Sequence, residues 1–178
     1  MSWVDRDSVH RELERTRATF HELHSRATSE DLRRPSNGTR WNNQQLLFHM
    51  LLGYLIMRAL MNLVRVFGRL PTRASAVFAG VLNAGTRPFD VANYLGSWAG
   101  GTALGQRGQL ILFDRVIAAL QRRLDAESDT DLARGMRYPT RWDPFFQDYM
   151  TLADLYRFPT QHFDFHRRQL TLAAGTVA

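Results

Sequence analysis

Two residue types are missing from this sequence of 178 residues, since it contains no cysteine and no lysine. Without cysteine, the chain has no disulfide, no cysteine-ligated zinc site and no cysteine nucleophile. Any metal ion must therefore be held by nitrogen and oxygen ligands, and any thiol chemistry must use a thiol brought in from outside. The absence of lysine beside abundant arginine and alanine is typical of a GC-rich genome.

A concentrated basic patch is also missing. All 23 basic residues are arginines, and the formal net charge is +6. The arginines are spread from Arg6 to Arg168, with three adjacent pairs and no basic run of five. Nucleic-acid binding usually needs basic side chains gathered on one face or in one run. The sequence therefore predicts no nucleic-acid partner.

No uninterrupted hydrophobic run is long enough to span a membrane. The most apolar stretch, residues 46–67, is interrupted by four polar side chains: His49, Arg58, Asn62 and Arg65. We expect it to form a buried helix of a bundle instead. The first residues lack the apolar core of a signal peptide. The expectation is a single domain over residues 1–178, with no membrane partner and a cytoplasmic location.

Apolar residues recur at steps of three and four in four long segments, which is the period of an amphipathic helix. The first helix ends near Thr28, the second follows Asn42, the third spans 109–125, and the fourth runs from Thr151 to about Ala173. No segment alternates with the period of a strand. The sequence thus predicts an all-α protein built as a four-helix bundle.

Two of these helices begin at capping boxes. Asn42 is followed three residues later by Gln45, and Thr151 by Asp154. In such a pair the first side chain accepts a hydrogen bond from the backbone of the second residue. The second side chain reaches back to the backbone of the first, so both pairs predict a helix start.

The segment 68–108, between the second and third main helices, is expected to hold extra short helices. Residues 89–108 carry glycines three to five apart. This pattern fits a loop that approaches a ligand, or a helix that uses small residues for close packing, and we favour the helix. Residues 29–41 and 127–140 are expected to be connections, and the aromatic-rich segment 138–150 an ordered loop.

Three histidines are candidates for a metal site. His162 and His166 are four residues apart on the fourth helix, which stacks both imidazoles on one face. His49 lies in the second turn of the second helix, and a bundle can bring it beside them. Three imidazoles leave a metal ion with open positions, as in catalytic sites. The alternative is three packed, hydrogen-bonded core histidines. The other histidines flank the first helix and are expected at its surface or boundary: His10, His21 and His24.

Helix phase separates the remaining polar residues near these histidines. Asp164 lies about 200° around the helix from each neighbouring histidine, so it should point away from the metal. Gln45 and Gly53 should share the face of His49, and Gln169 should line the same face near His162 and His166. The amides of Gln45 and Gln169 either orient the ligands or serve only as caps and structural partners.

Two motifs resemble the DinB/YfiT-like family. The segment W-N-N-Q-Q-L-L-F-H-M at 41–50 is similar to the tryptophan, cap, apolar pair and histidine that open the family's second helix. The segment H-F-D-F-H-R-R-Q-L at 162–170 is similar to its closing H-x-x-x-H-x-x-Q-[LI] motif. The resemblance covers essentially the whole chain. The segment 68–108 is a departure from the family pattern and is expected to shape the mouth of the pocket.

The resemblance implies an up-up-down-down bundle in which His49, His162 and His166 bind a divalent metal, typically zinc or nickel. Several members of the family transfer low-molecular-weight thiols or use them in isomerisation. Examples are the bacillithiol and mycothiol transferases and the mycothiol-dependent maleylpyruvate isomerase. The expected protein is a metal-dependent enzyme that activates a small thiol, of the mycothiol type in an actinobacterial source. The thiol would serve S-transfer, addition or isomerisation on a small electrophilic substrate.

Two other functions fit the same residues. One is hydrolysis or isomerisation by metal-bound water, and the other is a non-catalytic bundle that binds a metal or ligand. In each case the partners are small molecules, and the apolar faces of the bundle are compatible with a homodimer. Metal content together with thiol dependence separates the three functions.

Overall fold

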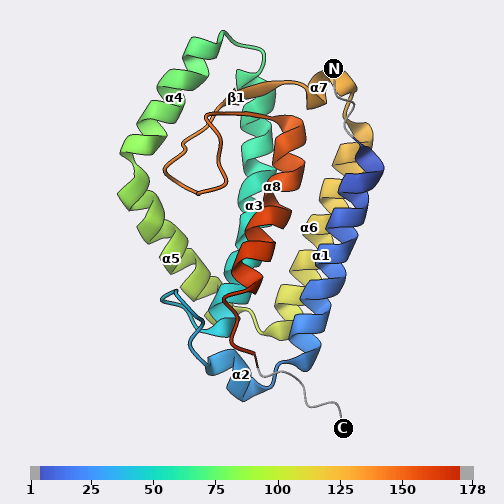
Figure 1. The fold of residues 1–178 in the computed structure, drawn as a ribbon, viewed down its shortest axis with the longest axis vertical. Helices are drawn as coiled ribbons and strands as arrows, with labels where there is room; N and C mark the ends of the chain where they lie inside the picture. Colours follow the sequence, from blue (N-terminus) through green and yellow to red (C-terminus); the bar gives the residue numbers. More distant parts are fainter. Residues whose placement is uncertain (1–4, 173–178) are drawn as a thin grey trace.

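Four long helices dominate the computed structural model of the protein, which describes residues 5–172 (Figure 1). They are α1 (Arg6–Arg26), α3 (Asn43–Phe67), α6 (Gln106–Ala126) and α8 (Leu152–Arg167). Their apolar faces meet in one core, which contains Leu13 and Phe20 of α1 and Phe113 of α6. The prediction of an all-α four-helix bundle is confirmed.

Contacts between the helices fix their directions. Arg6, at the start of α1, donates a hydrogen bond to the carbonyl oxygen of Leu124, near the end of α6, at 2.6 Å. His21, near the end of α1, lies 2.8 Å from Asp114, near the start of α6. These two helices are therefore antiparallel. Along α1, Glu12 pairs with Arg157 at 3.5 Å and Arg15 pairs with Asp164 at 2.7 Å. Because the two partners follow in the same chain order along α8, α1 and α8 run in parallel.

The order of directions is up-down-down-up, so the expected up-up-down-down order is wrong. The short connection through α2 (Ser29–Arg33) keeps the chain at one end of the bundle, and α3 therefore runs opposite to α1 (Figure 1). The connection through α4 (Thr72–Ala84) and α5 (Thr86–Ala103) spans the length of the bundle. It returns the chain to the end where α3 began, which makes α6 parallel to α3.

Both predicted capping boxes are present. The Asn42 side chain accepts from the backbone N–H of Gln45 at 2.9 Å, and Gln45 Oε1 accepts from the backbone N–H of Asn42 at 3.2 Å. Thr151 and Asp154 make the corresponding pair of bonds at the start of α8. Helix α8 ends at Arg167, earlier than expected, and Ala173 lies outside the described residues.

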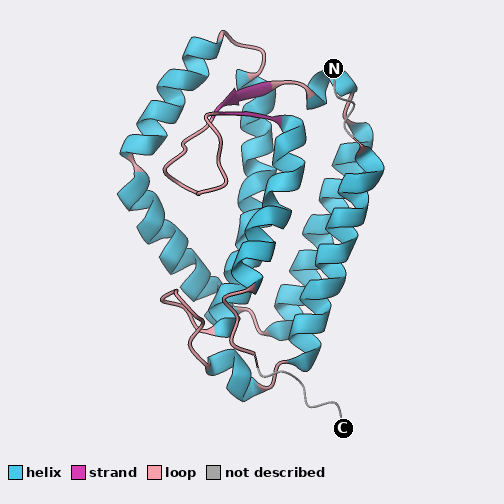
Figure 2. Ribbon diagram, viewed as in Figure 1, coloured by secondary structure: helices cyan, strands magenta, loops and turns pink. Residues whose placement is uncertain are grey.

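Several short elements lie in segments where the sequence predicts only connections. Helix α2 occupies part of 29–41, and 127–140 contains α7 (Asp129–Leu132) and strand β1 (Gly135–Arg137). Strand β1 pairs antiparallel with β2 (Tyr149–Thr151), with Met136 opposite Met150 (Figure 2). No alternating segment in the sequence predicts this pair of strands, and the all-α class is unchanged by it. Strands of three residues are too short to show alternation in a sequence.

Helices α4 and α5 confirm the extra helices between the second and third main helices, although α5 is longer than expected. Helix α5 packs against α3 through its glycines. A Cβ atom at Gly100 would lie 2.1 Å from the Phe48 ring, and one at Gly101 would lie 2.6 Å from the Cα of Gln45. At these two positions the glycines allow close packing of two helices, as the favoured interpretation requires.

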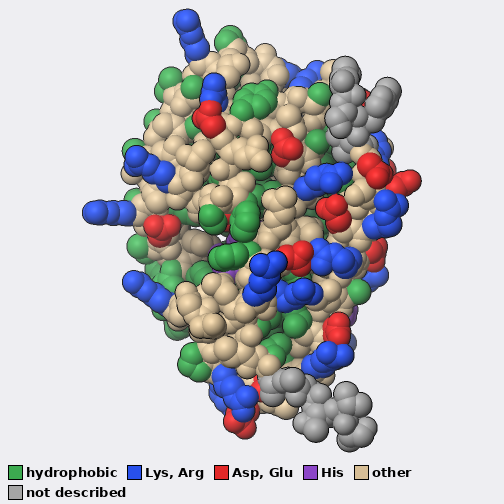
Figure 3. All heavy atoms as spheres, in the orientation of Figure 1, with side chains coloured by type: hydrophobic (Ala, Val, Ile, Leu, Met, Phe, Trp, Pro, Cys, Tyr) green, Lys and Arg blue, Asp and Glu red, His purple; other side chains and the backbone are tan. Residues whose placement is uncertain are grey.

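Helix α3 is the single helix among residues 5–172 that is long and apolar enough to cross a membrane by length and composition alone. Within its most apolar window, 56% is buried inside the protein. A core helix passes the same test, and the burial agrees with the predicted bundle helix. On the face drawn in Figure 3, basic and acidic side chains are interspersed. The cytoplasmic location and the absence of nucleic-acid and membrane partners stay predictions.

The three histidines of α1 differ in their surroundings. His10 lies 2.7 Å from Asp125, and His21 pairs with Asp114, both at partly exposed positions. His24 is buried against Phe20, with ring centroids 4.6 Å apart, so its expected surface or boundary position is wrong. Within the described part of the chain, neither ring nitrogen of His24 has a hydrogen-bond partner. Burial lowers its pKa from 6.5 to about 4, with a smaller contribution from His21.

Replacing His24 with leucine tests this buried position. The unfolded chain binds a proton at His24 below about pH 6.5, but the folded protein does so only below about pH 4. The free energy of unfolding therefore falls as the pH drops through this window. Between pH 7 and pH 4, the free energy of unfolding should therefore fall by up to about 3 kcal/mol less in metal-free His24→Leu than in metal-free wild type. Urea denaturation at each pH measures it. Equal losses would contradict the assignment.

Candidate metal centre

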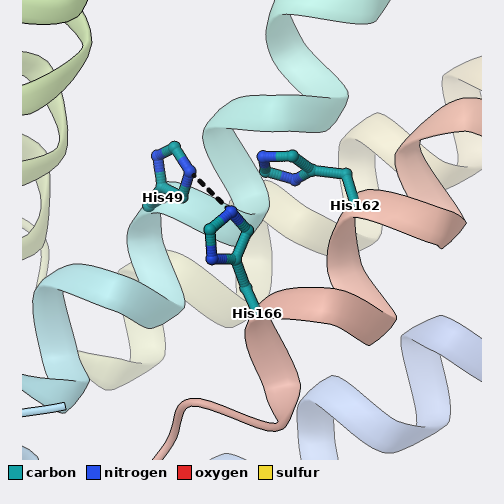
Figure 4. A group of neighbouring side chains, drawn as sticks. All are labelled: His49, His162 and His166. Atoms are coloured by element: carbon teal, nitrogen blue, oxygen red, sulfur yellow. Dashed lines mark hydrogen bonds between the residues drawn. The ribbon is translucent and has the colours of Figure 1, made fainter. Parts of the chain in front are cut away.

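The structure brings together the three histidines that the sequence singles out (Figure 4). His49 comes from α3, and His162 and His166 come from successive turns of α8. One ring nitrogen from each lies within 4.8 Å of the others. His49 Nε2 and His166 Nε2 are 3.2 Å apart. The antiparallel packing of α3 against α8 therefore creates a cluster of three converging imidazoles.

Hydrogen bonds on the outer ring nitrogens orient two of these imidazoles. His166 Nδ1 lies 2.7 Å from Gln169 Oε1, which can only accept, so Nδ1 donates and Nε2 keeps its lone pair. His49 Nδ1 lies 3.1 Å from Ser97 Oγ on α5. The sequence left two roles open for Gln45 and Gln169: orienting a histidine, or capping and pairing within the fold. Gln169 contacts a histidine, whereas Gln45 caps α3. Such partners fix the orientation of a metal-binding imidazole.

Burial keeps the three imidazoles uncharged. It lowers the pKa of His49 to about 3, with the nearby His166 as a second cause. It lowers the pKa of His162 well below 6.5 and also lowers the pKa of His166. At neutral pH all three rings are therefore neutral, which is the form that binds metals.

The donor set and its spacing fit a divalent metal ion. His49 Nε2 and His166 Nε2, 3.2 Å apart, share a hydrogen bond (Figure 4), and a metal ion bound at this point would take the place of its proton. Two nitrogen ligands of a tetrahedral zinc ion, each at about 2.0–2.1 Å, lie about 3.3 Å apart. The cluster can thus hold a metal ion with three imidazole ligands, which leaves further positions open. That arrangement is typical of catalytic rather than structural sites.

Gly53 makes room for His162. A Cβ atom at position 53 would lie 2.9 Å from His162 Nδ1 and 3.1 Å from its Cε1. Both distances are shorter than an ordinary van der Waals contact, so any side chain here would displace the imidazole. Gly53 also lies on the face of α3 that carries His49, as helix phase predicts. Glycine at position 53 therefore allows His162 to take its place in the cluster.

The three histidines line one wall of a cavity of about 220 Å³. The cavity lies between α3, α5 and α8, and residues 142–146 cover it. Seven of its sixteen lining residues are tryptophan or phenylalanine: Trp41, Phe89, Trp142, Phe145, Phe146, Phe158 and Phe165. The segment 138–150, expected to be an ordered aromatic loop, thus supplies part of the site.

Asp143 is a member of this site that the sequence reasoning missed. Its Oδ2 lies 3.8 Å from His162 Nε2, and its Oδ1 accepts from the backbone N–H of Phe145 at 2.8 Å. Burial raises its pKa to about 6. The sequence did contain a signal for this residue, because Asp143 is an acidic residue within the aromatic-rich segment 138–150. Asp164, by contrast, points to Arg15 on α1 and away from the cluster, as predicted.

The family sequence model of the DinB superfamily matches residues 12–170, which is most of the chain. The chain belongs to the DinB superfamily. The match extends from α1 to just beyond α8 and includes His49, His162 and His166, which confirms the family resemblance drawn from the two motifs. No curated protein and no solved structure matches this DinB-superfamily chain.

Substituting alanine at Gly53 tests the geometry of the cluster. The new Cβ would push His162 out of place, so we expect zinc affinity to fall about tenfold or more, as for loss of a ligand-orienting group. Competition with a chromophoric chelator measures the affinity. The matched control is Gly80→Ala in α4, where a Cβ would meet nothing within 4 Å. This control should keep full affinity, and an equally unchanged affinity in Gly53→Ala would contradict the account.

Proposed function

We propose that this protein is a divalent-metal-dependent enzyme that activates a small thiol for transfer to, or for addition and isomerisation of, a small electrophilic substrate. His49, His162 and His166 would hold the ion. The observation that carries the proposal is the cluster of three neutral, converging imidazoles on the wall of a cavity. Three protein ligands leave an open position where a substrate can bind. Zinc and nickel both suit three imidazoles.

The thiol would come from outside, because the chain has no cysteine. A divalent ion on three neutral imidazoles supplies positive charge that lowers the pKa of a thiol at its open position. The protein's own residues position the ligands for this role. Gln169 holds His166 in one tautomer, and Ser97 contacts the outer nitrogen of His49.

A polar cleft beside the cluster suits a hydrophilic thiol. This cleft has a volume of about 360 Å³ and shares Trp41, Asn93 and His166 with the aromatic cavity. Its other lining residues are mostly polar: Gly38, Thr39, Arg40, Asp90, Tyr94 and Gln169. Charged, amide and hydroxyl groups of this kind can bind the hydroxyls of a sugar. A thiol of the mycothiol type, which carries its cysteine on a sugar, therefore fits this cleft better than an apolar thiol would.

The test is thiol-dependent turnover by protein of known metal content. We expect about one zinc or nickel ion per chain, and turnover of an electrophile panel that needs both the metal and a thiol, with mycothiol ahead of glutathione and free cysteine. Chelation should abolish turnover, and the metal should restore it. His166→Ala should lower turnover by more than about 100-fold.

The matched control is His21→Ala, which removes a partly exposed histidine of α1 that pairs with Asp114. It should leave metal content and turnover unchanged. If the purified wild-type protein binds no metal, the proposal is wrong. A metal-loaded protein that turns over an electrophile or ester without any thiol would favour metal-bound water as the nucleophile. Metal binding with no turnover at all would favour a binding protein.

A further inference from the structure

The outer face of α5 is apolar although it is exposed. Five exposed residues recur along this helix at steps of three and four: Pro88, Val91, Leu95, Trp98 and Thr102. We call them the α5 stripe. Val91, Leu95 and Trp98 expose 57%, 51% and 49% of their surface. The solvent-facing side of a surface helix usually carries polar and charged residues instead.

The α5 stripe lies on the side of the helix that faces away from the candidate site. On the opposite side, Phe89 lines the cavity and Ser97 contacts His49. Figure 1 shows α4 and α5 at the outer edge of the molecule, with no other described element beyond them in this view. The two helices meet at an angle, so a straight partner helix can cover only one of them.

The exposed apolar side chains are concentrated on these two helices. Of the ten large hydrophobic side chains that are exposed among the described residues, five lie on α4 and α5. Single exposed apolar residues are ordinary, but contiguous ones mark a surface that another molecule covers. The longer of the two helices, α5, carries three of the five.

The spacing of the α5 stripe indicates that the covering element is itself a helix. Residues 88, 95 and 102 are seven apart, and so are residues 91 and 98. This is the a and d pattern with which one helix packs against another. The pattern is nearly symmetric about Leu95, so it matches a copy of itself that runs in the opposite direction. A twofold axis near Leu95 places Val91 of one copy opposite Trp98 of the other.

The charges at the two ends of α5 complement the same arrangement. The last turn of α5 contains no basic residue to meet the partial negative charge of its carbonyl end. Arg87 is exposed in the first turn and forms no ion pair within the described part of the chain. In an antiparallel pair, Arg87 of each copy lies beside the last turn of the other. The contact is reciprocal, as a twofold interface requires.

The size of the α5 stripe fits a pair of helices. With the neighbouring exposed alanines it offers roughly 500 Å² per copy, so a pair would bury roughly 1,000 Å², the lower limit for a specific interface. The expected dimer therefore dissociates on dilution. A membrane surface is the less favoured occupant, because helices that lie on membranes are rich in Lys and Arg, and Arg87 is the one basic residue of α5.

We propose that the α5 stripe is a dimer interface, in which α5 of one copy of this chain packs antiparallel against α5 of a second copy. The proposal needs neither a metal ion nor a thiol, so it goes beyond the proposed function. Helix α5 is then held from both sides, with Ser97 against His49 and Leu95 against the second copy. The dimer thereby restrains one wall of the cavity.

Sedimentation velocity from micromolar to near-millimolar protein tests the interface. We expect wild type to shift from monomer to dimer as the concentration rises. Leu95→Arg brings two like charges to the twofold axis, so the dissociation constant should rise at least about tenfold. The matched control is Ile111→Arg, which changes a similarly exposed apolar residue of α6 and should leave the dimer unchanged. A wild type that stays monomeric throughout, or a control that dissociates as strongly as Leu95→Arg, would overturn the proposal.

Cysteine cross-linking tests the direction of the pair, because the natural chain has no cysteine to interfere. With oxidised glutathione, Leu95→Cys should form a disulfide-linked dimer, and Ile111→Cys should remain monomeric. A mixture of Val91→Cys and Trp98→Cys should form mixed dimers in preference to dimers of Val91→Cys alone. Preferential linking of Val91→Cys to itself would contradict the antiparallel arrangement.

Vesicles of phosphatidylcholine and phosphatidylglycerol test the other occupant. If wild type is monomeric and sediments with these vesicles while Leu95→Arg does not, a membrane covers the α5 stripe and the proposal is wrong. None of these measurements uses turnover or metal content. Their failure would therefore leave the proposed metal and thiol chemistry standing, and failure of that chemistry would leave the dimer standing.

Discussion

The packing of α3 against α8 is the contact on which the candidate site depends. Along this antiparallel pair, His49 meets His166, Gly53 accommodates His162, and Tyr54 Oη lies 3.3 Å from Thr160 Oγ1. A shift of either helix by one turn would separate the three imidazoles. Because the cluster is buried, its rings are neutral, which is the form of an imidazole that binds a metal ion. The same packing that completes the core therefore builds the candidate metal site.

The additions to the bundle give this site its surroundings. Helix α5 brings Ser97 to His49 and Phe89 to the cavity, and its glycines let it approach α3 closely. The segment before α8 brings Trp142 and Asp143. Two of the main helices, α3 and α8, thus position the three histidines, while the inserted segments shape the polar cleft and the aromatic cavity.

Much of the fold and of the cluster could be predicted from local patterns in the sequence. The capping pairs at Asn42 and Thr151 mark real helix starts, and helix phase places Asp164 away from the cluster. Features set by distant contacts could not be predicted. The direction of α6 depends on the length of the α4–α5 connection, and the role of Asp143 depends on where its loop folds. His24 is a different case, because its spacing of four from Phe20 places it on the core face of α1, and the prediction followed its polar side chain instead.

X-ray absorption at the metal edge tests the central claim most directly, because it reports the atoms bound to the ion without any assumption about substrate. After loading with zinc or nickel, the account predicts a first shell of nitrogen and oxygen with the multiple-scattering pattern of three imidazoles. His166→Ala should remove one of them. A loaded protein whose metal lacks imidazole ligands, or one that retains no metal after gel filtration, would contradict the account.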